Sequence, residues 1–258
     1  MDNKKRTWGI IVSIVGIFAG LLLFYYLATT FMTVVHGKIN TNRVDEANAV
    51  KITFSMLSWL GLSASALWGA VLYGFLKKKD WAIFWGTLAA SAQMLAAFFP
   101  MIPPSSIGLP APTAQVFGIV AILWFAMMII AEKNWKIIAL LFFSGITFVL
   151  TYMDGVAMIS RYQTTANEIY KGIYATAFGV TWLGAAAWLT FIMAAFKGKS
   201  WALPLGIFSS IMSIIGGYSV AVLEHGFSMF LPAPVLATIL LVVFLFPSTE
   251  KLILAQAE

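Results

Sequence analysis

The chain contains no cysteine among its 258 residues. Disulfide bonds, thiolate metal sites and catalytic thiols are therefore excluded. Charge is also scarce, because lysine, arginine, aspartate and glutamate together make up only 10% of the sequence. So few charged groups cannot cover the surface of a soluble globule of this length.

Apolar residues take their place, at 61% of the sequence with a mean hydropathy of +0.91. A membrane-spanning helix needs about 20 residues. The sequence contains apolar runs at about 8–35, 50–76, 81–99, 115–131, 137–160, 172–196, 201–223 and 235–247. We therefore predict an all-α integral membrane protein with eight transmembrane helices, or seven, because the third, fourth and last runs are short. The first run is too long for a signal peptide and is counted as a membrane helix.

Lysine and arginine are distributed unevenly between the two faces that eight spans imply. One face carries Lys4, Lys5, Arg6, Lys77, Lys78, Lys79, Lys133, Lys136, Lys197, Lys199 and Lys251. The other face carries Lys38, Arg43, Lys51, Arg161 and Lys171. Because basic residues concentrate in cytoplasmic loops, this distribution predicts a multi-pass protein of the cell membrane with both termini in the cytoplasm. We expect the basic loops to contact membrane lipid, and nothing in the sequence supports nucleic-acid binding.

An internal repeat divides the chain. Leu109-Pro110-Ala111-Pro112 recurs as Leu231-Pro232-Ala233-Pro234. Trp81 and Gly86 recur as Trp201 and Gly206, and Trp59-Leu60-Gly61 recurs as Trp182-Leu183-Gly184. These matches predict two tandem four-helix membrane units, 1–132 and 133–258. Because each unit has an even number of spans, both should enter the membrane in the same, parallel orientation.

Small residues one helical turn apart let helices approach closely in a membrane. The first run has Gly16 and Gly20, the second has Gly61, Ser65 and Gly69, and the sixth has Gly172, Ala175, Gly179 and Gly184. We expect these faces to be helix interfaces. A solute path lined by hydroxyl groups, or a lipid groove, is the alternative.

Asp154 is the clearest ionisable residue within an apolar run. Arg161 lies seven residues later on the same helical face, so an Asp154–Arg161 pair is feasible, directly or through water. Asp154 is either a capped carboxylate near the outer interface or a contact for a ligand, proton or cation. Its counterpart in the first unit is Thr33. Gln93 and its repeat partner Ser213 are further candidates for ligand contact, with interhelical hydrogen bonding as the alternative.

The only histidines, His36 and His225, fall at outer ends of apolar runs, and Glu224 precedes the second. Imidazoles and a carboxylate on one rim can exchange protons or bind a metal, but the spacing is not that of a metal site. Hydrated surface groups are the alternative. We assign no metal ligand and no catalytic residue, because the usual phosphate-loop, zinc and haem motifs are missing from the sequence.

Two functions of different class fit these features. In the first, the protein binds or passes a small neutral or lipophilic solute at the interface of the two bundles. In the second, it is a non-catalytic membrane subunit that docks partner proteins, lipid or quinone through two apolar proline hairpins, residues 98–112 and 224–234. No cofactor is expected beyond bound lipid or quinone, and an enzyme is not expected.

Overall fold

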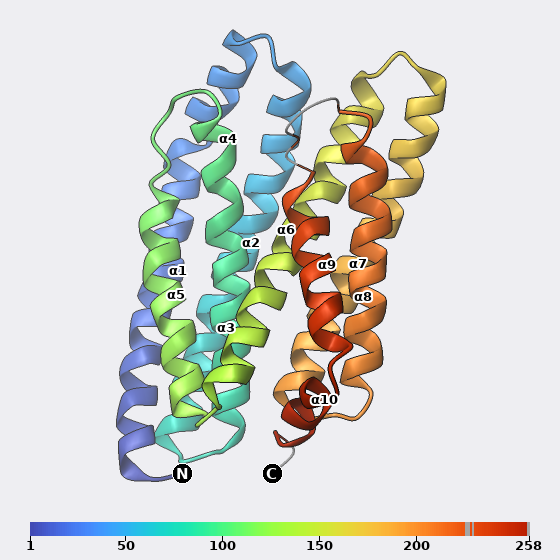
Figure 1. Ribbon diagram of the computed structural model, residues 1–258. Coiled ribbons are helices and arrows are strands. Elements are labelled where there is room, and N and C mark those ends of the chain that lie inside the picture. The colour runs from blue at the N-terminus through green and yellow to red at the C-terminus, as the bar shows by residue number, and fades with distance from the viewer. Residues whose placement is uncertain (225–227, 229, 257–258) are drawn as a thin grey trace. The chain divides into compact units, whose positions relative to one another are not determined.

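The computed structural model describes residues 1–224, 228 and 230–256, apart from the side chains of residues 45 and 49. The described residues form α-helices and turns and contain no strand. The chain divides into two compact units, Met1–Lys133 and Asn134–Glu258 (Figure 1). Each unit is a helical bundle.

Unit 1 contains four long helices that lie side by side. They are α1 (Asn3–Asn40), α2 (Val44–Leu76), α3 (Trp81–Phe98) and α5 (Thr113–Ile130). Two short helices, η1 (Phe99–Met101) and α4 (Ile102–Ser105), extend the end of α3. Each long helix packs against its neighbours along the chain, and α1 also packs against α5, so the four helices form a closed bundle.

Unit 2 repeats this order of packing with a shorter last helix. Its elements are α6 (Trp135–Thr164), α7 (Glu168–Phe196), α8 (Ala202–Ala221), α9 (Pro232–Phe244) and α10 (Pro247–Leu254). Consecutive helices pack against each other and α9 closes the bundle against α6. The first copy of the Leu-Pro-Ala-Pro sequence precedes α5, whereas Pro232 of the second copy begins α9.

Seven helices in the described ranges are long and apolar enough to cross a membrane: α1, α2, α3 with its extension to Ser105, α5, α6, α7 and α8. This is the construction of a polytopic α-helical membrane protein. The predicted eighth span is different, because α9 has 13 residues and is about 20 Å long. The chain then bends by 86° into α10, so α9 and α10 together are either a broken span or a re-entrant segment.

Five residues with a left-handed backbone end helices in the same way. In each case the amide of that residue and the next amide bond to carbonyl groups in the last helical turn, which is a Schellman motif. The five are Asn42, Lys78, Gly108, Glu132 and Gly198. The closures at Asn42 and Lys78 let consecutive helices of unit 1 reverse direction within a few residues, and Gly198 does the same between α7 and α8 of unit 2.

Glycines of α1 make room for side chains from neighbouring helices. A Cβ at Gly16 would lie 2.5 Å from the indole ring of Trp68, and a Cβ at Gly20 would collide with Ser65. By contrast, a Cβ at Gly172 or Gly179 of α7 would meet open space. The small residues predicted to line helix interfaces do so in α1, but only in part of α7.

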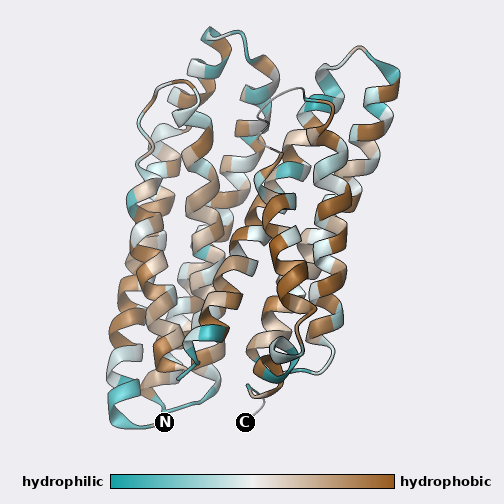
Figure 2. Ribbon diagram, viewed as in Figure 1, coloured by the Kyte–Doolittle hydropathy of each residue, from teal (hydrophilic) through white to brown (hydrophobic). Residues whose placement is uncertain are grey.

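Apart from Asp154 of α6, the charged residues described lie toward the ends of the helices, whereas the middle of each helix is mainly apolar (Figure 2). In unit 1 the N-terminal end is held by ion pairs. The terminal amino group is 3.6 Å from Asp80 Oδ1 in the α2–α3 turn, and Lys5 Nζ is 2.7 Å from Glu132 Oε2 after α5. The basic residues of the α2–α3 turn, the start of α1 and the end of α5 therefore share one end of this unit.

Candidate functional site

Gln93 joins three helices in the core of unit 1. The side chain is fully buried. Its Oε1 accepts a hydrogen bond from Trp68 Nε1 of α2 at 2.9 Å, and its Nε2 donates to the carbonyl oxygen of Gly16 of α1 at 2.8 Å. Both polar ends of the amide are engaged within the unit, as interhelical hydrogen bonding requires.

Ser213 occupies the corresponding place in unit 2. Trp188 Nε1 of α7 donates to Ser213 Oγ at 2.9 Å, and Thr151 Oγ1 of α6 lies 2.9 Å from the same oxygen. Tryptophan and polar partner are 25 residues apart in both units. The internal repeat in the sequence pairs Gln93 with Ser213, but it did not identify their tryptophan partners. The repeat was aligned through Trp59 and Trp182, which are different tryptophans.

Asp154 lies on the buried face of α6, with only 3% of its surface exposed. The hydroxyl residues Ser144, Thr147 and Thr151 precede it at helical spacing and are fully buried. Within the described part of the chain, Asp154 Oδ2 and Ser144 Oγ have no hydrogen-bond partner. Buried polar groups without a partner are costly, so Asp154 differs from the satisfied amide of Gln93.

Arg161 binds Glu224 rather than Asp154. Arg161 Nε is 2.9 Å from Glu224 Oε1, and Nη2 donates to Oε2 at 3.1 Å. Tyr174 Oη donates to the same carboxylate at 3.1 Å. The feasible Asp154–Arg161 pair is therefore not formed, since seven residues separate the two by about 10 Å along the helix axis and the end of α8 offers a nearer carboxylate.

The remaining predicted rim residues are not brought together. Thr33 and His36 are both exposed on α1, so Thr33 does not share the buried environment of Asp154. His225 lies outside the described residues. In the part of the chain that the structure does describe, no group of three or more histidine or acidic side chains is arranged to hold a metal ion.

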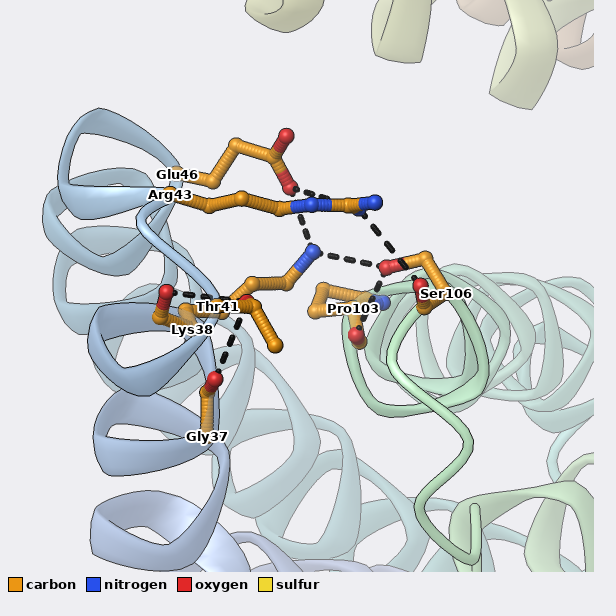
Figure 3. A network of polar contacts seen from close by, with 7 residues as sticks. All are labelled: Gly37, Lys38, Thr41, Arg43, Glu46, Pro103 and Ser106. Carbon is orange, nitrogen blue, oxygen red and sulfur yellow. Dashed lines mark hydrogen bonds and ion pairs between the residues drawn. The ribbon is translucent and has the colours of Figure 1, made fainter.

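A buried lysine fastens the α1–α2 end of unit 1 (Figure 3). Lys38 Nζ donates to Glu46 Oε2 of α2 and, at 2.6 Å, to Ser106 Oγ after α4. Arg43 Nη1 lies 3.8 Å from Glu46 Oε2 and donates weakly to the Ser106 carbonyl at 3.5 Å. Ser106 Oγ donates in turn to the Pro103 carbonyl at 2.9 Å. Sequence reasoning missed this Lys38 cluster, because Ser106 lies 68 residues from Lys38 in the sequence and reaches it only through the packing of unit 1.

The described apolar residues of the proline hairpins contact their own units. A Cβ at Gly37 of α1 would lie 2.7 Å from Ile107 Cδ1 and 3.2 Å from Leu109 Cδ1, so both hairpin side chains cover this glycine. In the second hairpin Phe230 is fully buried, in a cluster with Met158 and other core residues. Phe230 is thus part of the unit 2 core, whereas Ile107 and Leu109 contact α1 and remain partly exposed.

Unit 2 carries an apolar groove of about 530 Å³ between α6, α9 and α10. Its lining consists of Trp135, Lys136, Ala139, Leu140, Phe143, Leu236, Ile239, Leu240, Val243, Thr249 and Leu252. The Thr249 hydroxyl donates to the Val243 carbonyl at 2.6 Å and so is already satisfied. Lys136 is the one charged residue of this lining.

A second hollow of about 410 Å³ lies between α7 and α8. Gly172 and Gly216 line it, and the hydroxyl groups of Thr176 and Ser219 are its polar contribution. Thr176 Oγ1 donates to the Gly172 carbonyl at 3.0 Å, and Ser219 Oγ donates to the Gly216 carbonyl at 2.9 Å. Both hydroxyls are thus bonded within their own helices, and no charged residue lines this hollow.

Comparison with known proteins gives no match for this chain, whether with family models, curated proteins or solved structures. Its candidate sites are accordingly the groove between α6, α9 and α10 and the unpaired carboxyl of Asp154.

Proposed function

We propose that this polytopic membrane protein binds a lipophilic solute, which it takes from the bilayer into the groove between α6, α9 and α10. The groove volume of about 530 Å³ falls within the range of about 300–1,000 Å³ that is usual for small-molecule sites. Its apolar walls come from three helices, and the exposed side chains of Phe143 and Ile239 lie along it. A solute dissolved in the membrane can enter from the side of the bundle.

The buried polar residues of the two bundles give less support to ion-coupled transport. The buried amide of Gln93 and the hydroxyl of Ser213 bond to neighbouring helices and offer no free row of ligands. Asp154 is a single carboxyl, whereas proton and cation pathways in membranes are usually built from several ionisable groups. We therefore favour binding of a neutral or lipophilic solute over ion conduction.

Docking of partner proteins through the proline hairpins also receives less support. Among the described hairpin side chains, Ile107 and Leu109 contact Gly37 of α1, and Phe230 lies in the unit 2 core. A subunit of a larger complex would require another surface.

We also propose that the two units arose by duplication and that both termini lie in the cytoplasm. The turns at Lys78 and Gly198 have matching left-handed residues and matching hydrogen bonds 120 residues apart. The Gln93 and Ser213 contacts, each with a buried tryptophan, support duplication at the same offset. Basic residues at the N-terminal end of unit 1 support a cytoplasmic position for that end.

The test uses the protein in lipid nanodiscs that contain a phosphatidylcholine with a photoreactive acyl chain. After illumination, mass spectrometry locates the labelled residues. We expect labels on Phe143 and Ile239 of the groove in excess of those on Ile122 and Ile129 of α5, although both α5 residues are 70% exposed. The groove should hold a chain long enough to react.

Substitution of Ala139 by tryptophan should fill the groove and remove the excess labelling. The matched control, Ile122→Trp, places the same ring on an exposed face of α5 and should leave the groove labels unchanged. Labelling that follows exposure alone, or that is indifferent to Ala139→Trp, would contradict the proposal.

A further inference from the structure

We infer that the groove is a site for a glycerophospholipid with an anionic headgroup, which places its phosphate at Lys136 and one acyl chain along α6 and α9. This inference rests on the proposed function of the groove and identifies the class of solute. The observation behind it is the position of Lys136 at one end of the otherwise apolar groove.

The apolar walls alone cannot select a solute inside a membrane. Lipid tails are as apolar as leucine side chains, so moving a chain from the bilayer into the groove gains little hydrophobic free energy. Shape and contact hold the chain, whereas preference among lipids has to come from a polar or charged group. In this groove that group is Lys136, since the Thr249 hydroxyl already donates to the Val243 carbonyl.

Lys136 is well placed to hold an anion. It is the second residue of α6, and its backbone amide is capped by Asn134 Oδ1 at 2.9 Å. The positive end of the helix dipole therefore lies beside the lysine and adds to its attraction for a phosphate. In the described chain no hydrogen bond or ion pair engages the Lys136 ammonium group, which remains exposed.

The surroundings of Lys136 are those of the headgroup layer. Trp135, which is 71% exposed, lines the same end of the groove, and tryptophan is enriched where membrane meets water. Helix α10 turns away from α9 by 86°, and its Thr249 and Leu252 border the groove. Helix α10 itself carries one glutamate, Glu250, and one lysine, Lys251, whose charges offset each other, so the positive charge of this end of the groove is that of Lys136. An anionic headgroup matches this charge, and a neutral one does not.

The experiment measures lipid selection by native mass spectrometry of the delipidated protein. Phosphatidylglycerol and phosphatidylcholine with identical acyl chains are added at equal concentration. One lysine near a membrane surface contributes about fivefold in affinity for an anionic lipid, which is the expected excess of phosphatidylglycerol. Lys136→Gln should abolish the excess, whereas Lys4→Gln, which removes an exposed charge from unit 1, should preserve it.

Ala139→Trp, or Ile239→Trp if the first variant does not fold, should reduce binding of both lipids. Equal binding of the two lipids by the unaltered protein would overturn this inference. A preference for phosphatidylglycerol that survives Lys136→Gln would also overturn it. So would loss of the bound phosphatidylglycerol to an equal concentration of a neutral quinone. If tryptophan in the groove still reduced binding in those cases, the proposed function would stand. If neither tryptophan variant reduced lipid binding, both the proposed function and this inference would fail.

Discussion

Replacing Glu46 with glutamine should destabilise unit 1, because it leaves the Lys38 ammonium group buried without a counter-charge. The Lys38 side chain is 2% exposed and that of Glu46 is 46% exposed. Removing one partner of a fully buried ion pair costs about 3–5 kcal/mol. Because water reaches Glu46, we expect roughly half of this, about 2 kcal/mol of unfolding free energy.

Lys38→Met separates the charge from the packing. This change removes the buried charge together with its need for a partner, so we expect a loss of about 1 kcal/mol or less, mainly from the hydrogen bond to Ser106. The double variant Lys38→Met/Glu46→Gln should be no less stable than Glu46→Gln alone. Such non-additivity is the signature of two groups that interact directly.

The assay is reversible unfolding in mixed micelles, followed by tryptophan fluorescence. The control is Glu168→Gln, which breaks an exposed Lys171–Glu168 pair with a contact of 2.8 Å and a glutamate that is 82% exposed. It should have much less effect than Glu46→Gln. The reasoning is refuted if the two glutamine variants lose equal stability, or if the Lys38 and Glu46 substitutions are additive.

Three further outcomes follow from the same contacts. Ser213→Ala removes two interhelical hydrogen bonds and should lower the unfolding free energy by about 1–2 kcal/mol, whereas an unchanged unfolding curve would argue against these bonds. Asp154→Leu removes a buried carboxyl with an unpaired oxygen and should raise that free energy by about 1–3 kcal/mol, and destabilisation would show that the carboxyl has a partner. Gly16→Val should lower the unfolding free energy by about 1–3 kcal/mol, because the new side chain meets the Trp68 ring. The same unfolding assay measures this loss. Gly69→Val is its control, since a Cβ there meets open space, and equal losses would refute the packing argument.

Local patterns predicted much of the fold. Seven of the eight apolar runs coincide with helices capable of crossing a membrane. The eighth run coincides with α9, which has only 13 residues, and the chain bends by 86° into α10 at Phe246 and Pro247, so the eighth span stays a prediction. Hydropathy measures the apolar length of a segment and does not report a bend within it.

Side-chain partners were harder to predict than the residues themselves. Polarity singled out Gln93, Ser213 and Asp154, since few polar groups occur within apolar runs. Spacing along one helix suggested Arg161 as a partner for Asp154, but Arg161 contacts Glu224, 63 residues away in sequence. Such contacts depend on how helices are rotated against each other, which a single segment does not encode.

The sequence by itself determined that this chain is helical and suited to a membrane, because hydrophobic length and scarcity of charge act locally on each segment. Tertiary structure decided which polar groups are satisfied and which are not. Gln93 finds Trp68 and Gly16, whereas Asp154 Oδ2 finds no partner among the described residues. It also brought Lys136 of α6 beside α9 and α10, and so formed the groove. The physical reason is that helix rotation and close packing are set by contacts between distant segments.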